Sequence, residues 1–597
     1  MAKKKHKHKH KQSKGEQGRS RIAIFRFIAF SIPLLFFILL EIGLRIGGYG
    51  ESYPLFIDTP DSPNYLLARP DIIKRYFAKS ADIPTVTLET NLFLKEKPKN
   101  GLRIILQGGS TAAGFPYGYG ASPAGMLDQR LKRTFPDRTV EVINTAMSAV
   151  NSYTLLDFVD EIIEQQPDAV LIYAGHNEYL GILGVGSNYT AANSHAANLI
   201  FLKIREFRIF QLIQNIVSSF QSKPSKDIND QTLVGRDKRT MMAKVAKDKN
   251  IKMDSETYRL GLKQFKENLS LILGKYQKAN IPVYLSTIAS NLKDQKPFSS
   301  LNVNASTKDQ LNQIAKQLNT GNDLGGLKKS LSELSKQAFA ENNATIHYQL
   351  GKIFLAIGDY PASKGHFIAA KENDLLRFRA PEDFNRIIRS LAIQYKANIV
   401  DYQSRLSKSS KTGIIGNEFM LEHLHPNLQG YFILSDSFYQ KLKEDNIFGN
   451  WKHSVSTSVA WKQRPIVPAE EYAGYAKIAQ LKSDYPFTSS PQPLTLAKPA
   501  DWQQQLGIEY FQKKIGWLEM LNRSYAGYLK ERNVPMILKT SQIIADALPH
   551  NAQANYRVGR QLIQEGEDSL ARIYFQRAIR EEPENKIFSA AIKKLEH

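Results

Sequence analysis

Along the middle of the chain, short apolar runs alternate with stretches in which apolar residues recur at the helical period. This pattern predicts alternating strands and helices. The short apolar run at 102–107 is of the kind found in strands buried in a parallel sheet. Further strands are predicted at 140–145, 169–175, 281–288 and 397–402. Amphipathic stretches with a helical period separate or follow them, at 122–135, 152–166, 255–279 and 381–396. This order predicts a parallel α/β sheet with helices between its strands.

Two helical stretches, at about 190–250 and 305–375, interrupt this series. The second has small and aromatic residues at the spacing of tetratricopeptide repeats: Leu350, Gly351, Phe354, Gly358, Phe367 and Ala370. The C-terminal region repeats the pattern with Gly559, Ala571, Phe575, Ala578 and Pro583. Each such repeat is a helix hairpin that must stack on a neighbour to bury its apolar face. We therefore expect repeat-type hairpins, with helices around 502–531 and 534–548 as neighbours of the last one.

The most apolar stretch lies near the N-terminus, "IAIFRFIAFSIPLLFFILLEIGL" at 22–44. About 20 apolar residues suffice to cross a bilayer, and the charges Arg26 and Glu41 lie near the ends of this stretch. No small-x-small cleavage site follows, so we favour an uncleaved transmembrane signal-anchor over a signal peptide. The basic residues before it place the tail in the cytoplasm and the bulk of the chain outside, facing the periplasm if the cell is bacterial.

Charge and cysteine usage narrow the classes of partner. The formal net charge is +23, of which the first 21 residues contribute +8. This charge favours anionic neighbours such as lipid headgroups or acidic polysaccharide, whereas no zinc-finger or aromatic RNA-binding signature points to nucleic acid. The absence of cysteine excludes disulfides, thiolate catalysis, cysteine-ligated zinc and a lipoprotein anchor.

Four loops that follow predicted strands carry residues suited to chemistry. They read "GGST" at 108–111, "NTAMSAVNS" at 144–152, "AGHNEYLG" at 174–181 and "EHLHPNLQGY" at 422–431. Ligand sites in open α/β sheets lie at the carboxyl ends of the strands, so we expect these loops to meet. A serine becomes a nucleophile when a base takes its proton, and histidine has a suitable pKa for that base.

The order and spacing of these blocks resemble the SGNH (GDSL-type) hydrolases, which have a flavodoxin-like three-layer α/β/α fold. The resemblance implies that Ser110 is the nucleophile and His425 the catalytic base, with Glu422 as its acidic partner. It further implies an oxyanion hole formed by the backbone N–H groups of Ser110 and Ala149 and the side chain of Asn177. Such serine chemistry uses no cofactor and no metal ion. The repeats suggest the membrane-anchored bacterial branch that combines such repeats with the hydrolase domain.

The chain departs from the family pattern at three positions. Gly109 replaces the aspartate before the nucleophile, Ala149 replaces a glycine, and Glu422 replaces an aspartate. The longer Glu422 leaves its reach to the His425 ring open, and His423 competes for the same role. His176 is expected to be structural.

The expected organisation has seven parts. They are a basic tail (1–21), a transmembrane helix (22–46), a spacer (47–100), the hydrolase domain in two parts (101–300 and 376–445), a helical insert with a tetratricopeptide-like hairpin (301–375) and a helical C-terminal region with a repeat at about 552–585 (446–597).

Three functions are consistent with these features. The leading one is a serine esterase that is held in the lipid bilayer by residues 22–46 and removes acyl groups, O-acetyl among them, from an envelope glycan or glycolipid. The second is an O-acyltransferase in polysaccharide modification, with a sugar hydroxyl in place of water. The third is a scaffold of low or no activity that binds protein partners through its repeats.

Overall fold

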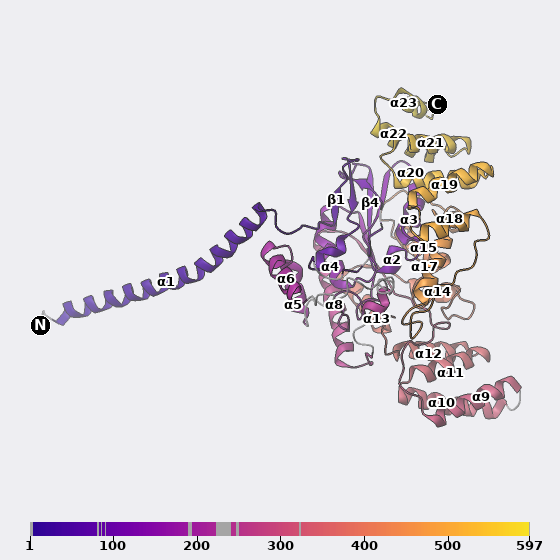
Figure 1. Ribbon diagram of the computed structural model, residues 1–597, viewed down its shortest axis with the longest axis horizontal. Helices are drawn as coiled ribbons and strands as arrows, with labels where there is room; N and C mark the ends of the chain where they lie inside the picture. Colours follow the sequence, from indigo (N-terminus) through magenta and orange to yellow (C-terminus); the bar gives the residue numbers. More distant parts are fainter. Residues whose placement is uncertain are drawn as a thin grey trace, which may run out of the picture. The chain divides into compact units, whose positions relative to one another are not determined.

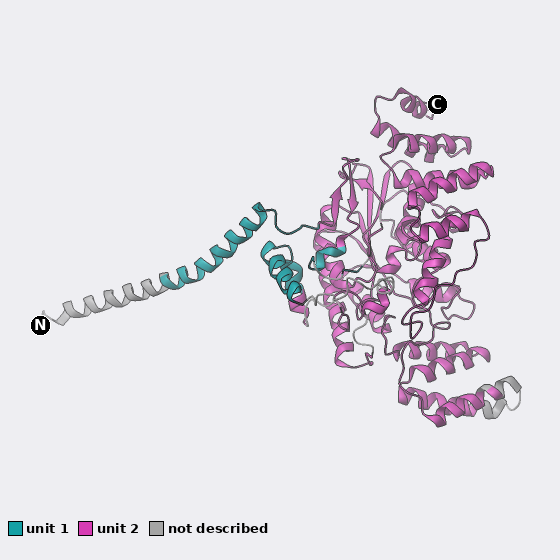
Figure 2. Cartoon of the chain, viewed as in Figure 1, with its two compact units in different colours: residues 1–53, 73–84, 199–230 teal, residues 54–72, 85–198, 231–597 magenta. Residues whose placement is uncertain are grey.

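The computed structural model describes residues 4–79, 83–84, 86–89, 91–188, 194–221, 240–245, 250–320 and 324–595. By its contacts the chain divides into two compact units (Figure 2). The smaller unit comprises residues up to 53, 73–84 and 199–230, and the larger unit comprises the rest.

A five-stranded parallel sheet forms the centre of the larger unit (Figure 1). Its strands are β4 Gly101–Gly108, β5 Thr139–Asn144, β6 Ala169–Tyr173, β7 Val283–Ser286 and β8 Asn398–Val400. They lie in the order β5-β4-β6-β7-β8, and every neighbouring pair is parallel, with Ile104 of β4 between Val142 and Ala169. Counted within the sheet this is the order 2-1-3-4-5 of flavodoxin-like folds. The parallel α/β sheet predicted from the sequence is confirmed.

Helices cover both faces of the sheet. They are α3 Pro123–Thr134, α4 Ser152–Glu164, α8 Glu256–Lys278, α13 Glu382–Tyr395, α14 Tyr402–Ser409 and α15 Leu428–Glu444. Helix α8 packs against α4 and α13, while α15 packs against α3 and α14. The crossover from β4 to β5 runs opposite to the later ones, so right-handed connections place α3 and the α4–α8–α13 group on opposite faces. Because the sheet is covered on both sides, all eight residues of β4 are buried.

Local signals in the sequence explain where these helices begin. The side chains of Ser122, Asn151 and Ser255 each accept a hydrogen bond from a backbone N–H of the first turn of α3, α4 and α8. The predicted ranges for the strands and helices of the sheet agree with the observed bounds to within a few residues.

Residues 54–72 and 91–94 form elements that the hydrophobic pattern does not reveal. A small antiparallel sheet contains β1 Phe56–Asp58, β2 Tyr65–Ala68 and β3 Phe93–Leu94, and the short 3-10 helix η1 Ile72–Tyr76 follows β2. Strands of two to four residues are too short to show a period-2 alternation, so the hydrophobic pattern predicts only a spacer here.

The remaining helices of the larger unit form an insert before β8 and a C-terminal region. The insert contains α9 Ala305–Thr320, α10 Leu324–Glu341, α11 Ala344–Ala356 and α12 Tyr360–Glu372. The C-terminal region contains α16 Thr457–Lys462, α17 Pro468–Lys482, α18 Trp502–Phe511, α19 Trp517–Lys530, α20 Val534–Ala547, α21 Ala552–Gln564, α22 Asp568–Glu581 and α23 Lys586–Lys593. Four short elements lie elsewhere in the described part of the chain: α2 Ser110–Ala113 and η2 Tyr119–Ala121 follow β4, and α5 His195–Ile204 and α7 Met241–Val245 lie between β6 and α8.

Helix hairpins occur at both places where the sequence predicts them. In α11–α12, a Cβ on Gly351 would lie 2.7 Å from the ring of Phe367, and in α21–α22 a Cβ on Gly559 would lie 2.5 Å from the ring of Phe575. The same glycine–phenylalanine contact therefore closes both hairpins. Their membership of the tetratricopeptide family stays a prediction.

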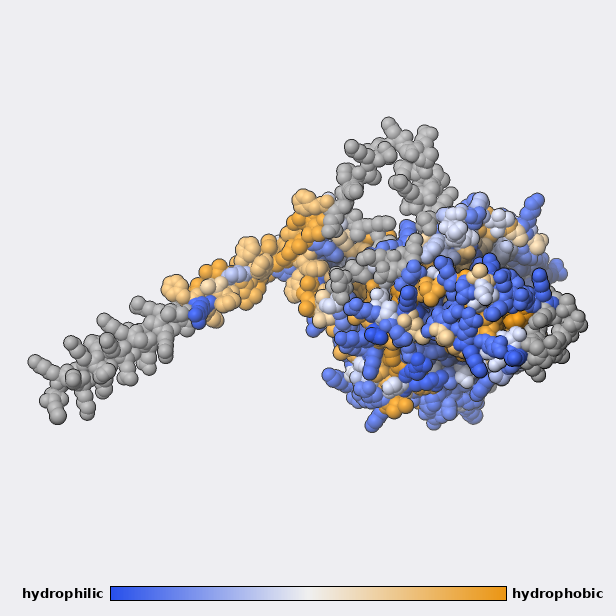
Figure 3. Space-filling view, turned by 90° about the horizontal axis from the view of Figure 1, so that it is seen from below, coloured by the Kyte–Doolittle hydropathy of each residue, from blue (hydrophilic) through white to orange (hydrophobic). Residues whose placement is uncertain are grey.

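The smaller unit contains most of α1 Lys4–Ile46 and α6 Arg208–Gln221. Residues Phe25–Ile46 of α1 are long and apolar enough to cross a membrane, and their apolar side chains are exposed (Figure 3). The Glu41 carboxylate near the end of α1 accepts a hydrogen bond of 3.0 Å from the backbone N–H of Ile209 at the start of α6.

Candidate active site

Ser110 lies directly after β4, as the first residue of the short helix α2. The chain turns sharply here because two glycines precede the serine. A Cβ on Gly108 would lie 2.2 Å from the carbonyl oxygen of Tyr173 in β6, so only glycine fits at that position. The turn places the Ser110 side chain at the carboxyl end of the sheet, at the switch point between β4 and its two neighbours.

The structure brings His425 to this serine across 315 residues of sequence. The His425 Nε2 atom lies 2.7 Å from Ser110 Oγ. On the other side of the ring, Nδ1 donates a hydrogen bond to Glu422 Oε1. This tautomer leaves the Nε2 lone pair to accept the serine proton, which is the arrangement of a serine–histidine–carboxylate triad.

The geometry answers the question of whether the longer Glu422 side chain reaches His425. Its carboxylate folds back over its own turn and accepts the backbone N–H groups of His423 at 2.6 Å and His425 at 2.8 Å. Asn291 Nδ2 also donates to the Glu422 carbonyl oxygen at 3.0 Å. The extra methylene therefore lets one carboxylate fix both the turn and the imidazole.

Ala149 and Asn177 line the same cavity as Ser110. Among the described residues, the N–H groups of Ser110 and Ala149 donate to no backbone carbonyl. Asn177 Nδ2 donates one hydrogen to the Val150 carbonyl at 3.0 Å, which leaves its second hydrogen for a ligand. These three residues line one cavity, and their role as an oxyanion hole stays a prediction.

Ala149 has a backbone φ of 63°, in the left-handed region that favours glycine. Its carbonyl accepts the N–H of Ile182 at 2.7 Å, and a β-bridge joins Val150 to Ile182. These contacts hold the alanine in a conformation that costs roughly 1–2 kcal/mol for an L-residue.

Gly109 stands where the family resemblance expects an aspartate. A Cβ on Gly109 would lie 2.9 Å from Asn177 Nδ2, closer than side chains normally approach. A side chain at position 109 would therefore require the Asn177 amide to shift.

Glu178 is a buried residue of this site that the sequence did not reveal. Its carboxylate accepts the Ser152 hydroxyl at 2.6 Å, the Ser152 N–H at 3.1 Å and the Gln264 side chain at 2.6 Å. Burial raises its pKa to about 6, and these hydrogen bonds act in the opposite direction. The network joins the Asn177 loop to the start of α4 and to Gln264 in the third turn of α8. The only sequence signal was an acidic residue next to Asn177.

Two further histidines lie near the triad. His423 contacts Glu422 Oε2 and packs among the rings of Phe298 and Phe487, whereas His176 Nδ1 accepts the Ala380 N–H at 3.2 Å. Burial lowers the pKa of His176 to about 3, and that of His425 also to about 3. His425, not His423, contacts the serine, and the neutral imidazole that a base requires is the stable form.

Glu422, His423 and His425 also have the composition of a metal site, with one ligand atom of each within 4.8 Å of the others. Two of these three side chains already have other partners, since Glu422 accepts two backbone N–H groups and His425 spans Glu422 and Ser110. The donor set therefore fits the triad arrangement better than a metal centre.

A cavity of about 410 Å³ opens beside Ser110 and His425. Most of its wall is apolar: Phe115, Ala149, Leu180, Met241, Met242, Val245, Phe378, Leu424 and Leu481. The polar lining residues are Ser110, Ser148, Asn177, Thr240, His423, His425, Lys477 and Gln480. The site can therefore hold an apolar group against a reactive serine.

The fold and this site together define a class, a flavodoxin-like α/β domain with a serine–histidine–carboxylate triad at its topological switch point. No protein-family model and no curated protein matches the sequence. Among solved structures, the acetylxylan esterase Axe2 from Geobacillus stearothermophilus aligns over 58% of this chain and 96% of its own, with 13% identity and a TM-score of 0.26. The lipase/acylhydrolase from Enterococcus faecalis aligns over the same shares with 12% identity and a TM-score of 0.26. At these identities and TM-scores, the similarities carry no information about the activity of this chain.

Proposed function

We propose that this protein is a serine esterase that works through an acyl-serine intermediate. The observation that carries the proposal is the contact between Ser110 Oγ and His425 Nε2 at 2.7 Å, with Glu422 on the far side of the ring. A hydrogen bond from serine to a buried, neutral histidine at the mouth of a cavity is the arrangement that serine hydrolysis requires.

The reaction follows from this geometry in two halves. His425 takes the Ser110 proton as Oγ attacks the ester carbonyl carbon, and the N–H groups of Ser110 and Ala149 and the Asn177 amide stabilise the oxyanion. The imidazolium then gives its proton to the departing alcohol oxygen, and the acyl group stays on Ser110. Water, deprotonated by His425, attacks the acyl-serine, and the carboxylic acid leaves with the serine proton restored. Glu422 keeps the ring oriented and stabilises its charged form throughout.

The apolar cavity beside Ser110 is the proposed site for the acyl group. Its volume of about 410 Å³ admits an acetyl group and leaves room for several more methylenes. Each buried methylene contributes roughly 0.8 kcal/mol of transfer free energy, so the cavity favours acyl groups longer than acetyl.

The alcohol part of the substrate is proposed to be an envelope glycan or glycolipid. The apolar helix Phe25–Ile46 supports a location at a membrane, and the basic tail before it supports an extracytoplasmic position of the larger unit. A positively charged protein surface favours an anionic glycan or headgroup nearby.

Hydrolysis of p-nitrophenyl esters from acetate to decanoate tests the proposal. We expect turnover that falls by at least about 10³-fold in Ser110→Ala, because the residual rate after loss of the nucleophile is small. Ser409→Ala, on an exposed helix end away from the cavity, is the matched control. Equal rates in the two variants, or labelling of another residue by a serine-reactive phosphonate, would remove Ser110 from the mechanism.

A further inference from the structure

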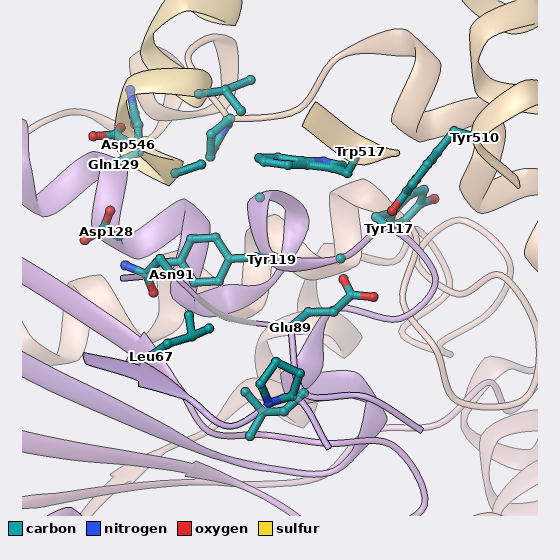
Figure 4. Close-up of a pocket in the computed structure, with 18 residues that line it drawn as sticks. Leu67, Glu89, Asn91, Tyr117, Tyr119, Asp128, Gln129, Tyr510, Trp517 and Asp546 are labelled. Atoms are coloured by element: carbon teal, nitrogen blue, oxygen red, sulfur yellow. The ribbon is translucent and has the colours of Figure 1, made fainter. Parts of the chain in front are cut away.

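A second cavity, of about 350 Å³, lies where the small antiparallel sheet, the α/β domain and the C-terminal helices meet (Figure 4). We call it the Glu89 cavity. Its walls come from β2, the loop before β3, the turn at η2, and helices α3, α18, α19 and α20. It contains neither Ser110 nor any histidine, so the proposed esterase chemistry does not use it.

Three aromatic side chains surround one end of the Glu89 cavity. Figure 4 shows Trp517, Tyr510 and Tyr117 there, with the Glu89 carboxylate pointing toward them. Trp517 is fixed by its Nε1–H, which donates to Glu470 Oε1 at 2.7 Å. Tyr117 lies against Gly474 of α17, where a Cβ would approach its ring to 2.5 Å. The rings are thus held in place by the protein and present their surfaces to the cavity.

The Glu89 carboxylate contributes a negative charge to the wall of the cavity. Among the described residues it forms no ion pair, whereas the other two carboxylates of the cavity do. Asp128 pairs with Lys132, and Asp546 pairs with Lys132 at 3.2 Å and with Arg577 at 2.7 Å. The Glu89 carboxylate rests on the backbone of Gly118, where a Cβ would lie 2.5 Å from Glu89 Oε2. In a chain of net charge +23, this cavity therefore has a local negative charge.

We propose that the Glu89 cavity binds a substituted ammonium group, with the cation between the Trp517, Tyr510 and Tyr117 rings and the Glu89 carboxylate. Aromatic faces attract cations electrostatically, and three rings around a carboxylate form the kind of cage that recognises alkylated ammonium ions. Apolar side chains such as Leu88 and Ile543 line the rest of the cavity and suit the alkyl groups of such an ion.

One of the three rings, that of Tyr510, already lies near a cation. The Lys477 Nζ atom lies 5.6 Å from the centre of the Tyr510 ring and donates to the Pro116 carbonyl at 3.0 Å. Lys477 also lines the active-site cavity, as does Phe115, two residues before Tyr117. The two cavities have no lining residue in common, and the chain segment 115–117 connects one to the other. The ammonium group belongs either to a lipid headgroup or to a free small molecule.

Calorimetric titration of the full-length protein in nonionic micelles with tetramethylammonium tests this proposal. We expect saturable binding that weakens about tenfold or more in Glu89→Gln and in Trp517→Leu. Choline should bind, and its neutral isostere 3,3-dimethylbutan-1-ol should bind at least tenfold more weakly. Glu565→Gln and Trp502→Leu, which change a glutamate and a tryptophan outside the cavity, should leave binding unchanged. Thermal unfolding checks that each variant folds. Glu89 is exposed, so we expect Glu89→Gln to fold normally. This variant therefore tests the proposal even if Trp517→Leu unfolds.

Competition separates the two sources of the ammonium group. Displacement of tetramethylammonium by phosphatidylcholine, but not by phosphatidylglycerol, in mixed micelles identifies a lipid headgroup. Binding without such displacement identifies a free small ammonium compound. No binding, equal binding of the neutral alcohol, displacement by maltotriose, or unchanged binding in Glu89→Gln would each overturn the proposal. None of these outcomes depends on esterase activity.

Discussion

Glu422 combines two roles in one carboxylate, because it closes the 422–425 turn through two backbone N–H groups and orients the His425 ring. Removing its charge while keeping its shape separates these roles. We expect Glu422→Gln to lower kcat by roughly 10²–10⁴-fold, as loss of the triad carboxylate does elsewhere, with a smaller change in KM. Steady-state kinetics with a soluble ester measures this, and Glu418→Gln in the same loop is the control. A kcat within twofold of the parent would assign Glu422 to the turn alone.

Burial makes His425 a base that works at low pH. Because its pKa is lowered to about 3, the ring stays neutral as the pH falls from 7. We expect the acid limb of kcat/KM to lie below pH 6.5, the usual value for histidine. The His425 ring binds its proton near pH 6.5 in the unfolded chain and only at much lower pH in the folded chain. The free energy of unfolding therefore decreases as the pH falls below about 6.5. Circular dichroism at each pH separates unfolding from titration, and a limb at 6.5 in a folded protein would contradict the prediction.

Ala149 stores strain that glycine would release. At φ 63° the alanine methyl is unfavourable, whereas glycine adopts this region freely. We expect Ala149→Gly to raise the free energy of unfolding by about 0.5–1 kcal/mol, measured by thermal or denaturant unfolding. Ala146→Gly, a buried position in the same loop without positive φ, should instead destabilise the protein. A loss of stability in both variants would show that the Ala149 methyl is needed for packing.

Strands and helices of the parallel sheet were predictable because each combines a strong periodic pattern with a local start signal. Every residue of the run 102–107 is buried in β4. The Ser122 side chain caps the first turn of α3. Ser110 and Asn177 lie in loops that follow two strands of the sheet, and the resemblance to the SGNH hydrolases added His425, which lies beyond β8 and α14. The Glu178 network and the Glu89 cavity could not be predicted, since their members come from distant segments whose approach depends on tertiary packing. The strands β1 to β3 were missed because they are too short to show a period.

The two helix hairpins depend on a glycine that lets a phenylalanine ring approach the facing helix. A methyl group on Gly351 would collide with Phe367 at 2.7 Å. We expect Gly351→Ala to destabilise the protein by about 1–3 kcal/mol through overpacking. Gly365→Ala on the partner helix α12 has no neighbour within 4 Å and should stabilise it by about 0.5–1 kcal/mol through helix propensity. Thermal unfolding compares them, and equal shifts would show that the contact does not limit hairpin packing.

The orientation of the whole chain in a membrane can be tested directly because the sequence contains no cysteine. Single cysteines placed in the basic tail at Ser13 and in the larger unit at His453 report the two sides. We expect a membrane-impermeant maleimide to label intact spheroplasts at 453 and not at 13, since basic residues remain on the cytoplasmic side. Labelling of the cysteine at position 13 before lysis, or of the cysteine at position 453 only after lysis, would indicate the opposite orientation.

The long separation between the serine and its histidine has a consequence for synthesis. The ribosome completes Ser110 315 residues before His425, with the insert α9–α12 between them. At 5–20 residues per second this interval lasts roughly 15–60 s. Throughout it, the nascent chain carries the Ser110 hydroxyl without His425, and β8 Asn398–Val400 is added only near its end. The contact between Ser110 and His425 can therefore form only after β8 and the turn at 422–425 have been synthesised.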